Sequence, residues 1–278
     1  MNEFPPGNRL INALDAGDRE ALQQHCTRVE FPQGFIFFEP GDEIEHIHFI
    51  DSGIVSSVAV LEDGRTVETV MIGPEGVAGS TAAFVPHRAF TRNAAQVAGT
   101  SRRIDAARLR QLCAARPGLR ETIAGFAADL QGELEQSAAC NALHRAEQRF
   151  AKWLLRSHDR VEVDAINLTQ EYLASMLGSQ RTTVNEAAQG LQKAGAIAYS
   201  RGRIRVLDRA ALERVACECY RATASVRDDR RGGRNLGRSS RFRRHGPAFD
   251  EPPSRWSTRR RPRRRAWLVH PTQYGGGR

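Results

Sequence analysis

The sequence has no apolar run close to the ~20 residues that a membrane-spanning helix needs. Its first residues, MNEFPPGNRL, show no basic segment followed by an apolar one, so no signal peptide is predicted. Cysteine is scarce, with five in 278 residues, and neither a disulfide framework nor a pair of CxxC units is present. We therefore expect a soluble protein of a reducing compartment, without a membrane partner.

Lysine is absent from residues 1–147, where 13 arginines stand against 20 acidic residues. Residues 148–226 hold 12 basic and 8 acidic residues, and residues 227–278 hold 16 arginines and 4 acidic residues. Most of the formal net charge of +9 therefore comes from the C-terminal segment. An acidic segment followed by a mildly basic one is typical of a sensor joined to a nucleic-acid-binding domain.

The N-terminal part of the chain changes from one periodicity to another. Apolar spacing around Leu10, Leu14 and Leu22 predicts one or two short helices within residues 8–26. Residues 28–104 then alternate short β-rich runs with glycine-containing turns, and Glu62-Asp63-Gly64-Arg65 is typical of a hairpin turn. Roughly six to eight short strands of this kind predict an antiparallel roll or barrel.

Helical spacing returns at residue 105. A short helix is predicted over 105–114, a long one over 119–144 and a further one over 145–157. The apolar residues of the long helix are spaced by threes and fours, as in a dimer-forming helix. The alternative is a helix that packs only on its own roll. These apolar residues are Leu119, Ile123, Phe126, Leu130 and Leu134.

Residues 168–207 predict two helices followed by a β-hairpin. Thr169 can cap a first helix that ends at Gly178, and Ser179 can cap a second helix over 180–194 that ends before Gly195. Two short strands, 197–200 and 203–207, flank an Arg201-Gly202 turn. Helix, glycine turn, helix and basic hairpin in this order predict a winged helix-turn-helix. The apolar face of the second helix is Val184, Ala187, Ala188 and Leu191.

Over roughly residues 8–225, these motifs together resemble the Crp/Fnr family of bacterial transcription regulators. The resemblance rests on the glycine turns of the predicted roll and on the segment LTQEYLASMLGSQRTTVNEAAQGLQKAGAIAYSRGRIRVLD. It implies an α+β fold with an N-terminal antiparallel β-roll (a double-stranded β-helix), a long dimerisation helix and a C-terminal winged helix-turn-helix. The turns are Pro40-Gly41-Asp42, Asp51-Ser52-Gly53, Asp63-Gly64-Arg65 and Gly73-Pro74-Glu75-Gly76.

The resemblance also implies a domain organisation and a set of partners. The expected domains are a cyclic-nucleotide-binding-like sensor roll over 8–118, a dimerisation helix over 119–144 and a winged helix-turn-helix DNA-binding domain over 145–226. The expected partners are a near-palindromic double-stranded DNA operator, a second copy of the chain, RNA polymerase and an unidentified small-molecule effector. The expected location is the cytoplasm, and no catalysis, cofactor or metal is expected.

The residues that bind cyclic nucleotides in this family are only partly present. Cyclic-nucleotide binders of the family have Gly-Glu, whose carboxylate accepts the ribose hydroxyl, and Arg-Ser or Arg-Thr, whose guanidinium neutralises the phosphate. The corresponding residues here are Gly79-Ser80 and Arg92-Asn93. Arg92 can still meet a phosphate, but Ser80 supplies no carboxylate. A roll that serves as a scaffold or binds another ligand is therefore favoured over a cyclic AMP sensor. The candidate effector pocket is Gly79, Ser80, Arg92 and Asn93.

Metal sites are the other alternative. Only Cys26 lies before residue 113, which excludes the N-terminal iron–sulfur cluster pattern of the oxygen-sensing branch. Two ligands at the spacing of Cys217-Glu218-Cys219 rarely form a metal site alone, so this pair is interpreted as buried or incidental. A cupin-like metal enzyme is the hypothesis of a different class, because His46 and His48 share one face of a strand. The further ligands of a cupin are missing from their expected places, and no GxSxG, HExxH or P-loop motif is present.

The second helix of the motif should enter the major groove with its N-terminal turns. Arg181 can bind guanine, Gln180 or Asn185 can bind adenine, and Glu186 can accept from cytosine. Hydroxyls and backbone N–H groups near helix starts can meet phosphates, and arginines alternate along the wing. The family pattern matches Arg181 but not Thr182 or Glu186. The candidate DNA-binding residues are Thr169, Gln170, Ser179, Gln180, Arg181, Thr182, Thr183, Asn185, Glu186, Arg201 and Arg203.

Apolar periodicity stops at about Val226. Residues 227–278 are rich in arginine, glycine and proline, with too few apolar residues to offset the entropy of ordering them. We predict a disordered tail that adds non-specific, salt-sensitive DNA affinity. A shifted reading frame near residue 227 is the alternative explanation for the abrupt change.

Overall fold

The N-terminal part begins with the two predicted short helices. The computed structural model describes residues 7–161, 165–168, 170–200 and 202–222. The two helices are α1 (Arg9–Ala13) and α2 (Ala16–Gln23). Asn8 and Asp15 cap them, each accepting hydrogen bonds from backbone N–H groups of the first turn. The Asn8 amide also donates to the carbonyl oxygens of Ile50 and Gly76, at 2.8 Å each, and so fixes α1 on the following roll.

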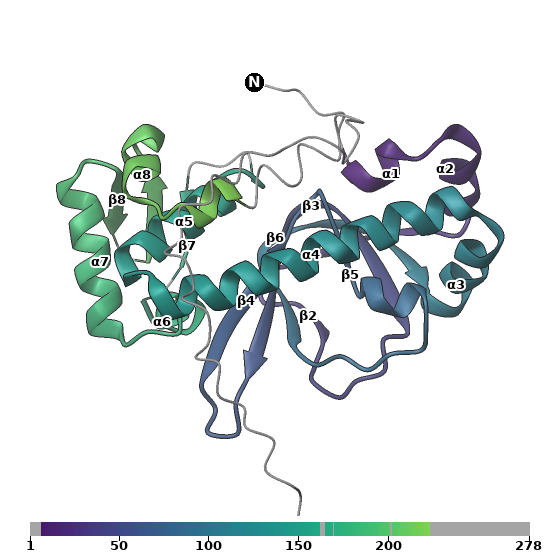
Figure 1. Cartoon of the computed structure of the whole chain (residues 1–278), viewed down its shortest axis with the longest axis horizontal. Helices are drawn as coiled ribbons and strands as arrows, with labels where there is room; N and C mark the ends of the chain where they lie inside the picture. Colours follow the sequence, from purple (N-terminus) through teal and green to yellow (C-terminus); the bar gives the residue numbers. More distant parts are fainter. Residues whose placement is uncertain (1–6, 162–164, 169, 201, 223–278) are drawn as a thin grey trace, which may run out of the picture. The chain divides into compact units, whose positions relative to one another are not determined.

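The predicted antiparallel roll follows (Figure 1). Its strands are β1 (Thr27–Phe31), β2 (Ile36–Phe38), β3 (His46–Val60), β4 (Thr66–Ile72), β5 (Val77–Ala78) and β6 (Arg92–Asp105), with a short 3₁₀ helix η1 (Ser80–Ala83). They pair in the order β1-β6-β3-β4, and β2 and β5 pair with β6 and β3. The long strands β3 and β6 therefore form the centre of the roll.

Two of the predicted β-rich runs, 46–50 and 54–61, belong to the single strand β3. Gly53 has a φ of +86° and lies where the pairing of β3 with β6 shifts register. A Cβ at this position would lie 2.7 Å from the carbonyl oxygens of Val97 and Ala98, so only glycine lets β6 pass this close. The glycine pattern predicted a corner, and the structure has a bulge within one strand.

Two helices follow the roll, α3 (Ala106–Ala115) and α4 (Pro117–Leu143). Leu119 and Ile123 are fully buried in the core of the roll, Phe126 is 8% exposed, and Leu130 packs against the same core. The apolar stripe that predicted a dimer seam thus faces the chain's own roll along the first half of α4. For Leu119, Ile123 and Phe126 the seam prediction is wrong, because the roll already buries them without a second chain. Leu130 and Leu134 are only partly buried, so for these two residues the seam stays a prediction.

The C-terminal part contains the predicted winged helix-turn-helix (Figure 1). Its helices are α5 (Ala146–His158), α6 (Gln170–Leu177), α7 (Arg181–Lys193) and α8 (Arg209–Val215), and its strands are β7 (Ala165–Asn167), β8 (Ile197–Ser200) and β9 (Arg203–Val206). The strands form an antiparallel sheet in the order β7-β9-β8. Phe150, Leu154 and Leu191 are fully buried in this domain's core. The helices α5, α6 and α7 and the hairpin β8-β9 follow the predicted order, whereas the strand β7 and the helix α8 are further elements that the sequence analysis did not predict.

A buried carboxyl group connects β4 to α5. Glu68 is 9% exposed and accepts hydrogen bonds from Trp153 Nε1 at 2.9 Å and from Ser56 Oγ at 2.6 Å. Burial raises the pKa of the Glu68 carboxyl, while the two donors oppose that rise. Because the Trp153 ring brings both apolar area and an N–H donor, one side chain joins the helix-turn-helix domain to the roll.

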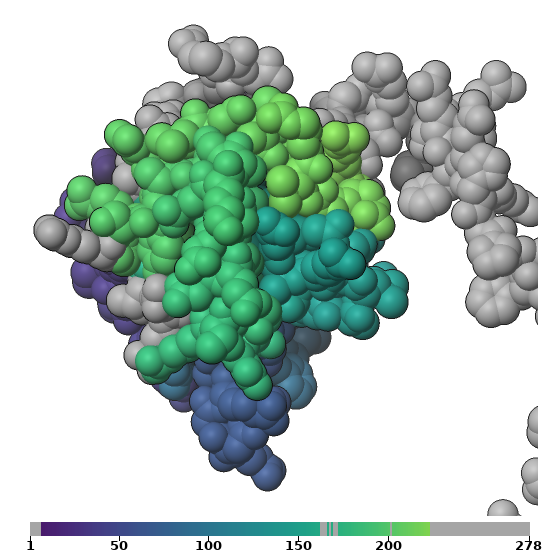
Figure 2. All heavy atoms as spheres, turned by 90° about the vertical axis from the view of Figure 1, so that its left-hand side faces the viewer, coloured from purple at the N-terminus to yellow at the C-terminus, as the bar shows by residue number. Residues whose placement is uncertain are grey.

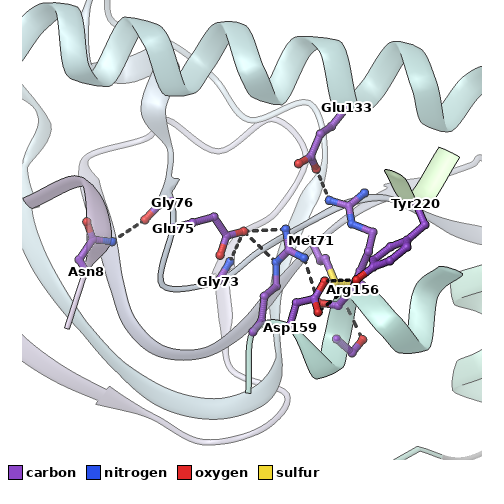
Figure 3. Close-up of polar contacts among 11 residues, drawn as sticks. Asn8, Met71, Gly73, Glu75, Gly76, Glu133, Arg156, Asp159 and Tyr220 are labelled. Carbon is purple, nitrogen blue, oxygen red and sulfur yellow. Dashed lines mark hydrogen bonds and ion pairs between the residues drawn. The ribbon is translucent and has the colours of Figure 1, made fainter. Parts of the chain in front are cut away.

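Two buried ion pairs involve α5 and the residues just after it, and Figure 3 shows them. Arg160, just after α5, binds Glu75 of the roll at 2.6 Å, and neither side chain is more than 4% exposed. Arg156 of α5 binds Glu133 of α4. Burial lowers the pKa of Arg156 to about 9, against its ordinary 12.5. Each pair holds two charges out of water, so removing one partner leaves the other uncompensated.

The predicted disordered segment 227–278 lies outside the described residues, as do residues 1–6 and 223–226. None of the described helices combines the length and the apolar character required to cross a membrane.

Candidate nucleic-acid interface

The helix α7 has one buried and one exposed face. Val184, Ala187, Ala188 and Leu191 are at most 5% exposed and pack in the domain core, as the sequence pattern predicted. The polar side chains of its N-terminal half lie on the surface, on the green side of the molecule that faces the viewer in Figure 2. Gln180, Arg181, Thr182 and Glu186 are exposed, and Thr183 and Asn185 are partly exposed. A helix exposed in this way can place several polar side chains against base edges at once.

The start of α7 differs from the prediction at Ser179. The N-cap is Gln180 and no side chain caps the helix, so the prediction that Ser179 caps it is wrong. Ser179 Oγ instead donates to the Leu177 carbonyl at 3.2 Å and accepts from Arg149 Nη2 at 2.9 Å. These two partners, Arg149 of α5 and Leu177 at the end of α6, hold the serine hydroxyl away from the first turn of α7.

Arg149 of α5 is a residue that the sequence analysis missed. Besides Ser179, its guanidinium donates to the Leu177 carbonyl at 2.9 Å and to Asn141 Oδ1 at 3.0 Å. It thereby satisfies the C-terminal carbonyl of α6 and fixes the turn into α7. An arginine beside an apolar helical stripe gives no sequence signal of such a role, because its partner lies 28 residues away.

The turn between α6 and α7 requires a glycine. Gly178 has a φ of +55°, and a Cβ there would lie 3.0 Å from Val67 Cγ2 of β4. Next to it, the hydroxyl of Ser175 contacts that of Thr66. The helix-turn-helix therefore rests on β4, and the direction of α7 depends on this contact.

The wing has the predicted alternation. Arg203 and Arg205 are exposed, while Ile204 between them is 1% exposed and belongs to the domain core. Thr169 and Arg201 lie outside the described residues, and Gln170 is the first residue of α6. The two described arginines give the hairpin a positive face that suits phosphates.

The candidate effector residues come from two segments that both contact β2. Gly79-Ser80 begins η1, and Arg92-Asn93 begins β6. Phe38 pairs with Asn93 in the sheet, and its ring lies 3.2 Å from where a Cβ on Gly79 would stand. Arg92 Nε donates to both carboxylate oxygens of Glu39, at 3.0 and 2.9 Å. The guanidinium expected to meet a phosphate is thus paired with a carboxylate of the chain itself.

The two histidines of the cupin-like hypothesis gather no further ligands. His48 is 6% exposed, with Nδ1 3.1 Å from Ser101 Oγ and its ring edge-on to Phe37 at 4.9 Å. Burial lowers the pKa of His48 to about 4. Among the described residues, neither His46 nor His48 belongs to a group of three or more side chains placed to hold a metal ion.

Comparison with known proteins matches both domains. The model of the cyclic nucleotide-binding domain matches residues 28–116, and that of the Crp-like helix-turn-helix domain matches residues 148–215. A curated relative is the CRP-like cAMP-activated global transcriptional regulator of Mycobacterium tuberculosis (strain CDC 1551 / Oshkosh). It is 28% identical over 196 residues, which cover 67% of this chain and 87% of the relative.

Solved structures share the fold. The c-di-GMP responsive global regulator CLP of Xanthomonas campestris superposes with a TM-score of 0.59 at 19% identity, covering 70% of this chain and 100% of that protein. FixK2 from Bradyrhizobium japonicum superposes with a TM-score of 0.59 at 18% identity, covering 69% of this chain and 98% of that protein.

A β-roll, a long helix and a winged helix-turn-helix with an exposed recognition helix define a DNA-binding transcription regulator. In this chain a cyclic nucleotide-binding domain is followed by a Crp-like helix-turn-helix domain, and the curated relative is named as a CRP-like transcriptional regulator. The chain belongs to the Crp/Fnr family, a family of transcription regulators and not of enzymes.

Proposed function

We propose that the protein binds a near-palindromic DNA operator as a homodimer in the cytoplasm and controls transcription together with RNA polymerase. The observation that carries this proposal is the two-faced α7, which buries Val184 and Leu191 and exposes Arg181 and Glu186. Such a helix fits the major groove with its N-terminal turns against base edges.

The exposed and partly exposed side chains at the start of α7 have chemically suitable targets. The Arg181 guanidinium can donate to O6 and N7 of guanine, and the Asn185 or Gln180 amide can bind N6 and N7 of adenine. Glu186 can accept from a cytosine amino group. Thr182 is proposed to lie on the same base-facing side of α7. The phosphate-binding residues are proposed to be Thr169, Gln170, Ser179, Thr183, Arg201 and Arg203, near helix starts and along the wing.

The homodimer is proposed to form along the outer face of α4, opposite the stripe that packs on the roll. Small and polar residues are exposed there, so two copies of the helix could approach closely. Replacing Ala128 and Gly132 by Glu should therefore give monomers in sedimentation experiments, while Arg108→Glu on α3 should stay dimeric. The exposed residues of this face include Glu121, Ala124, Ala128, Gln131, Gly132, Glu135 and Ala139.

The roll is proposed to respond to a ligand other than cyclic AMP or to serve as a scaffold. The relatives differ in this respect, since one is named as cAMP-activated and another as c-di-GMP responsive. In this chain Ser80 replaces the ribose-binding carboxylate, and Glu39 already pairs with Arg92. Both observations oppose the usual mode of cyclic AMP binding.

Selection of genomic DNA fragments with the purified full-length protein tests the function. The enriched fragments should share two half-sites related by a two-fold axis, with centres about 10 base pairs or a multiple apart. The selection is repeated with candidate nucleotides to detect an effector. If no motif is enriched under any condition, the assignment of α7 as the recognition helix is wrong, whereas a single unpaired half-site would contradict only the homodimer.

A further inference from the structure

A group of cysteine and histidine side chains lies where α4 meets the end of the helix-turn-helix domain. Cys140 is in the last turn of α4, and His144 is its C-cap residue. Cys217 and Cys219 follow α8, more than 70 residues later in the chain. The four potential ligand atoms all lie within 4.8 Å of one another, and the three thiols are buried.

Two distances in this group match the edges of a small tetrahedron, and all four ligand atoms lie within 4.8 Å of one another. Cys140 Sγ lies 3.6 Å from Cys217 Sγ, and Cys219 Sγ lies 3.6 Å from His144 Nδ1. Tetrahedral zinc with Zn–S bonds of about 2.3 Å requires sulfur atoms about 3.8 Å apart, and slightly less between sulfur and nitrogen. In an iron–sulfur cluster the ligands bind different iron atoms and so lie further apart. The spacing therefore fits one metal ion.

The surroundings orient these side chains as ligands. The Nε2 of His144 lies 3.1 Å from Glu218 Oε1, so a carboxylate can hold the ring with Nδ1 toward the thiols. Histidine ligands of metals commonly use a carboxylate in this way. Gln136 Nε2 donates to Cys219 Sγ at 3.0 Å, a contact that favours a thiolate.

The charge of the group also suits a cation. The Lys152 ammonium group lies near the Cys140 thiol and interacts with it electrostatically. Three buried thiolates without a cation would repel one another, whereas zinc offsets two of the three charges and Lys152 lies near the remainder.

We propose that Cys140, His144, Cys217 and Cys219 bind one structural zinc ion. Binding releases the thiol protons to solvent and leaves no open coordination position, so the ion has no catalytic role. The site joins the end of α4 to the segment after α8, across the short connection at residues 144–145 between α4 and α5. Zinc at this point would fix the direction in which the helix-turn-helix domain leaves α4.

Metal content of the full-length protein, purified without a metal-affinity column and under reducing conditions, tests the proposal. Elemental analysis should give about one zinc per chain. Cys217→Ser and His144→Ala should lose it, whereas His144→Cys, which completes a four-thiolate set, should keep it. The matched control is Cys113→Ser, because Cys113 is a buried thiol of the roll core and lies outside the group. Glu218→Ala should weaken zinc binding by about tenfold through the orientation of His144.

Cobalt binding provides a second measurement, and with the wild-type protein its result does not depend on how well any variant folds. The zinc-depleted wild-type protein should take up one Co²⁺ per chain and show thiolate-to-cobalt charge-transfer bands with the strong visible bands of a tetrahedral site. The position of these bands should shift in His144→Cys. A wild-type protein that contains no zinc and takes up no cobalt would overturn the proposal. A Cys140–Cys217 disulfide found by mass spectrometry in the freshly purified protein would also overturn it, in favour of a redox pair.

Discussion

The recognition helix and the effector region of the roll differ in how much of their family's chemistry they retain. In α7, Arg181 keeps the position of a base-contacting arginine and lies exposed. In the roll, Ser80 stands where a carboxylate is expected, and Arg92 is bound to Glu39. Both regions belong to well-packed cores, so the fold does not reveal this difference. It follows that packing and ligand-binding residues are separate properties of the sequence, and function has to be argued from the site.

The largest effect should come from the recognition helix. Arg181→Ala removes a bidentate contact to guanine at a cost of about 1–3 kcal/mol per half-site, or roughly 2–6 kcal/mol for a dimer on two half-sites. Fluorescence anisotropy with a selected operator should therefore show loss of specific binding, with weak non-specific binding retained. Gln192→Ala, in the exposed last turn of the same helix, should bind as wild type does. If Arg181→Ala binds the operator as tightly as the wild-type protein does, the assignment of α7 as the recognition helix is wrong.

The contact between the roll and the helix-turn-helix domain, which contain the two regions, should give the next largest effect. Arg160→Met leaves the buried Glu75 carboxylate without its partner, which should lower the free energy of unfolding by about 3–5 kcal/mol. In the double variant Glu75→Gln/Arg160→Met no charge is stranded, so most of the stability should return. Urea denaturation of the two variants and of Glu75→Gln measures the coupling. Additive effects would show that the ion pair does not join the roll to the helix-turn-helix domain.

The sequence predicted elements better than partners. The positions of α7 that face the core follow from period alone, because a helix buries residues three and four apart. The apolar stripe of α4 was equally clear, but period does not say whether a roll or a second chain covers it, and the roll covers Leu119, Ile123 and Phe126. Glycine spacing likewise could not separate the bulge at Gly53 from a turn.

Contacts over long sequence separations could not be predicted. Cys217 and Cys219 looked incidental in the sequence, because the two side chains that complete their group lie more than 70 residues earlier. The same holds for the pairing of Arg92 with Glu39, 53 residues away, and for the hold of Arg149 on the turn before α7. Side-chain chemistry of this kind becomes visible only once the fold brings the segments together.

A smaller effect is expected on the pH dependence of stability, where the buried His48 of the roll should contribute and an exposed histidine should not. Burial lowers the pKa of His48 to about 4. On acidification this side chain is therefore protonated near pH 6.5 in the unfolded chain but only near pH 4 in the folded chain. The stability is therefore complete above pH 6.5 and falls as the pH decreases, by about 2 kcal/mol between pH 7 and pH 5. His48→Gln should flatten this part of the stability–pH curve. His25→Gln, at an exposed position, should leave it unchanged, and an unchanged slope in His48→Gln would assign the acid sensitivity to other groups.

The last prediction is that cyclic AMP does not bind to the roll at micromolar concentrations. Titration calorimetry at micromolar concentrations should show no saturable heat, because Ser80 offers no carboxylate to the ribose and the Arg92 guanidinium is held by Glu39. The Phe38 ring also lies against Gly79, where the ligand would approach the protein backbone.

If Ser80 and the Glu39–Arg92 pair prevent binding, Ser80→Glu combined with Glu39→Gln should raise the affinity for cyclic AMP. The double variant adds the missing acceptor for the ribose hydroxyl and releases Arg92. Glu43→Gln, an exposed carboxylate on the same side of the roll that does not pair with Arg92, is the matched control and should change nothing. A saturable isotherm with the wild-type protein would instead show that cyclic AMP readily displaces Glu39 from Arg92. The roll would then still bind cyclic AMP without a carboxylate at position 80.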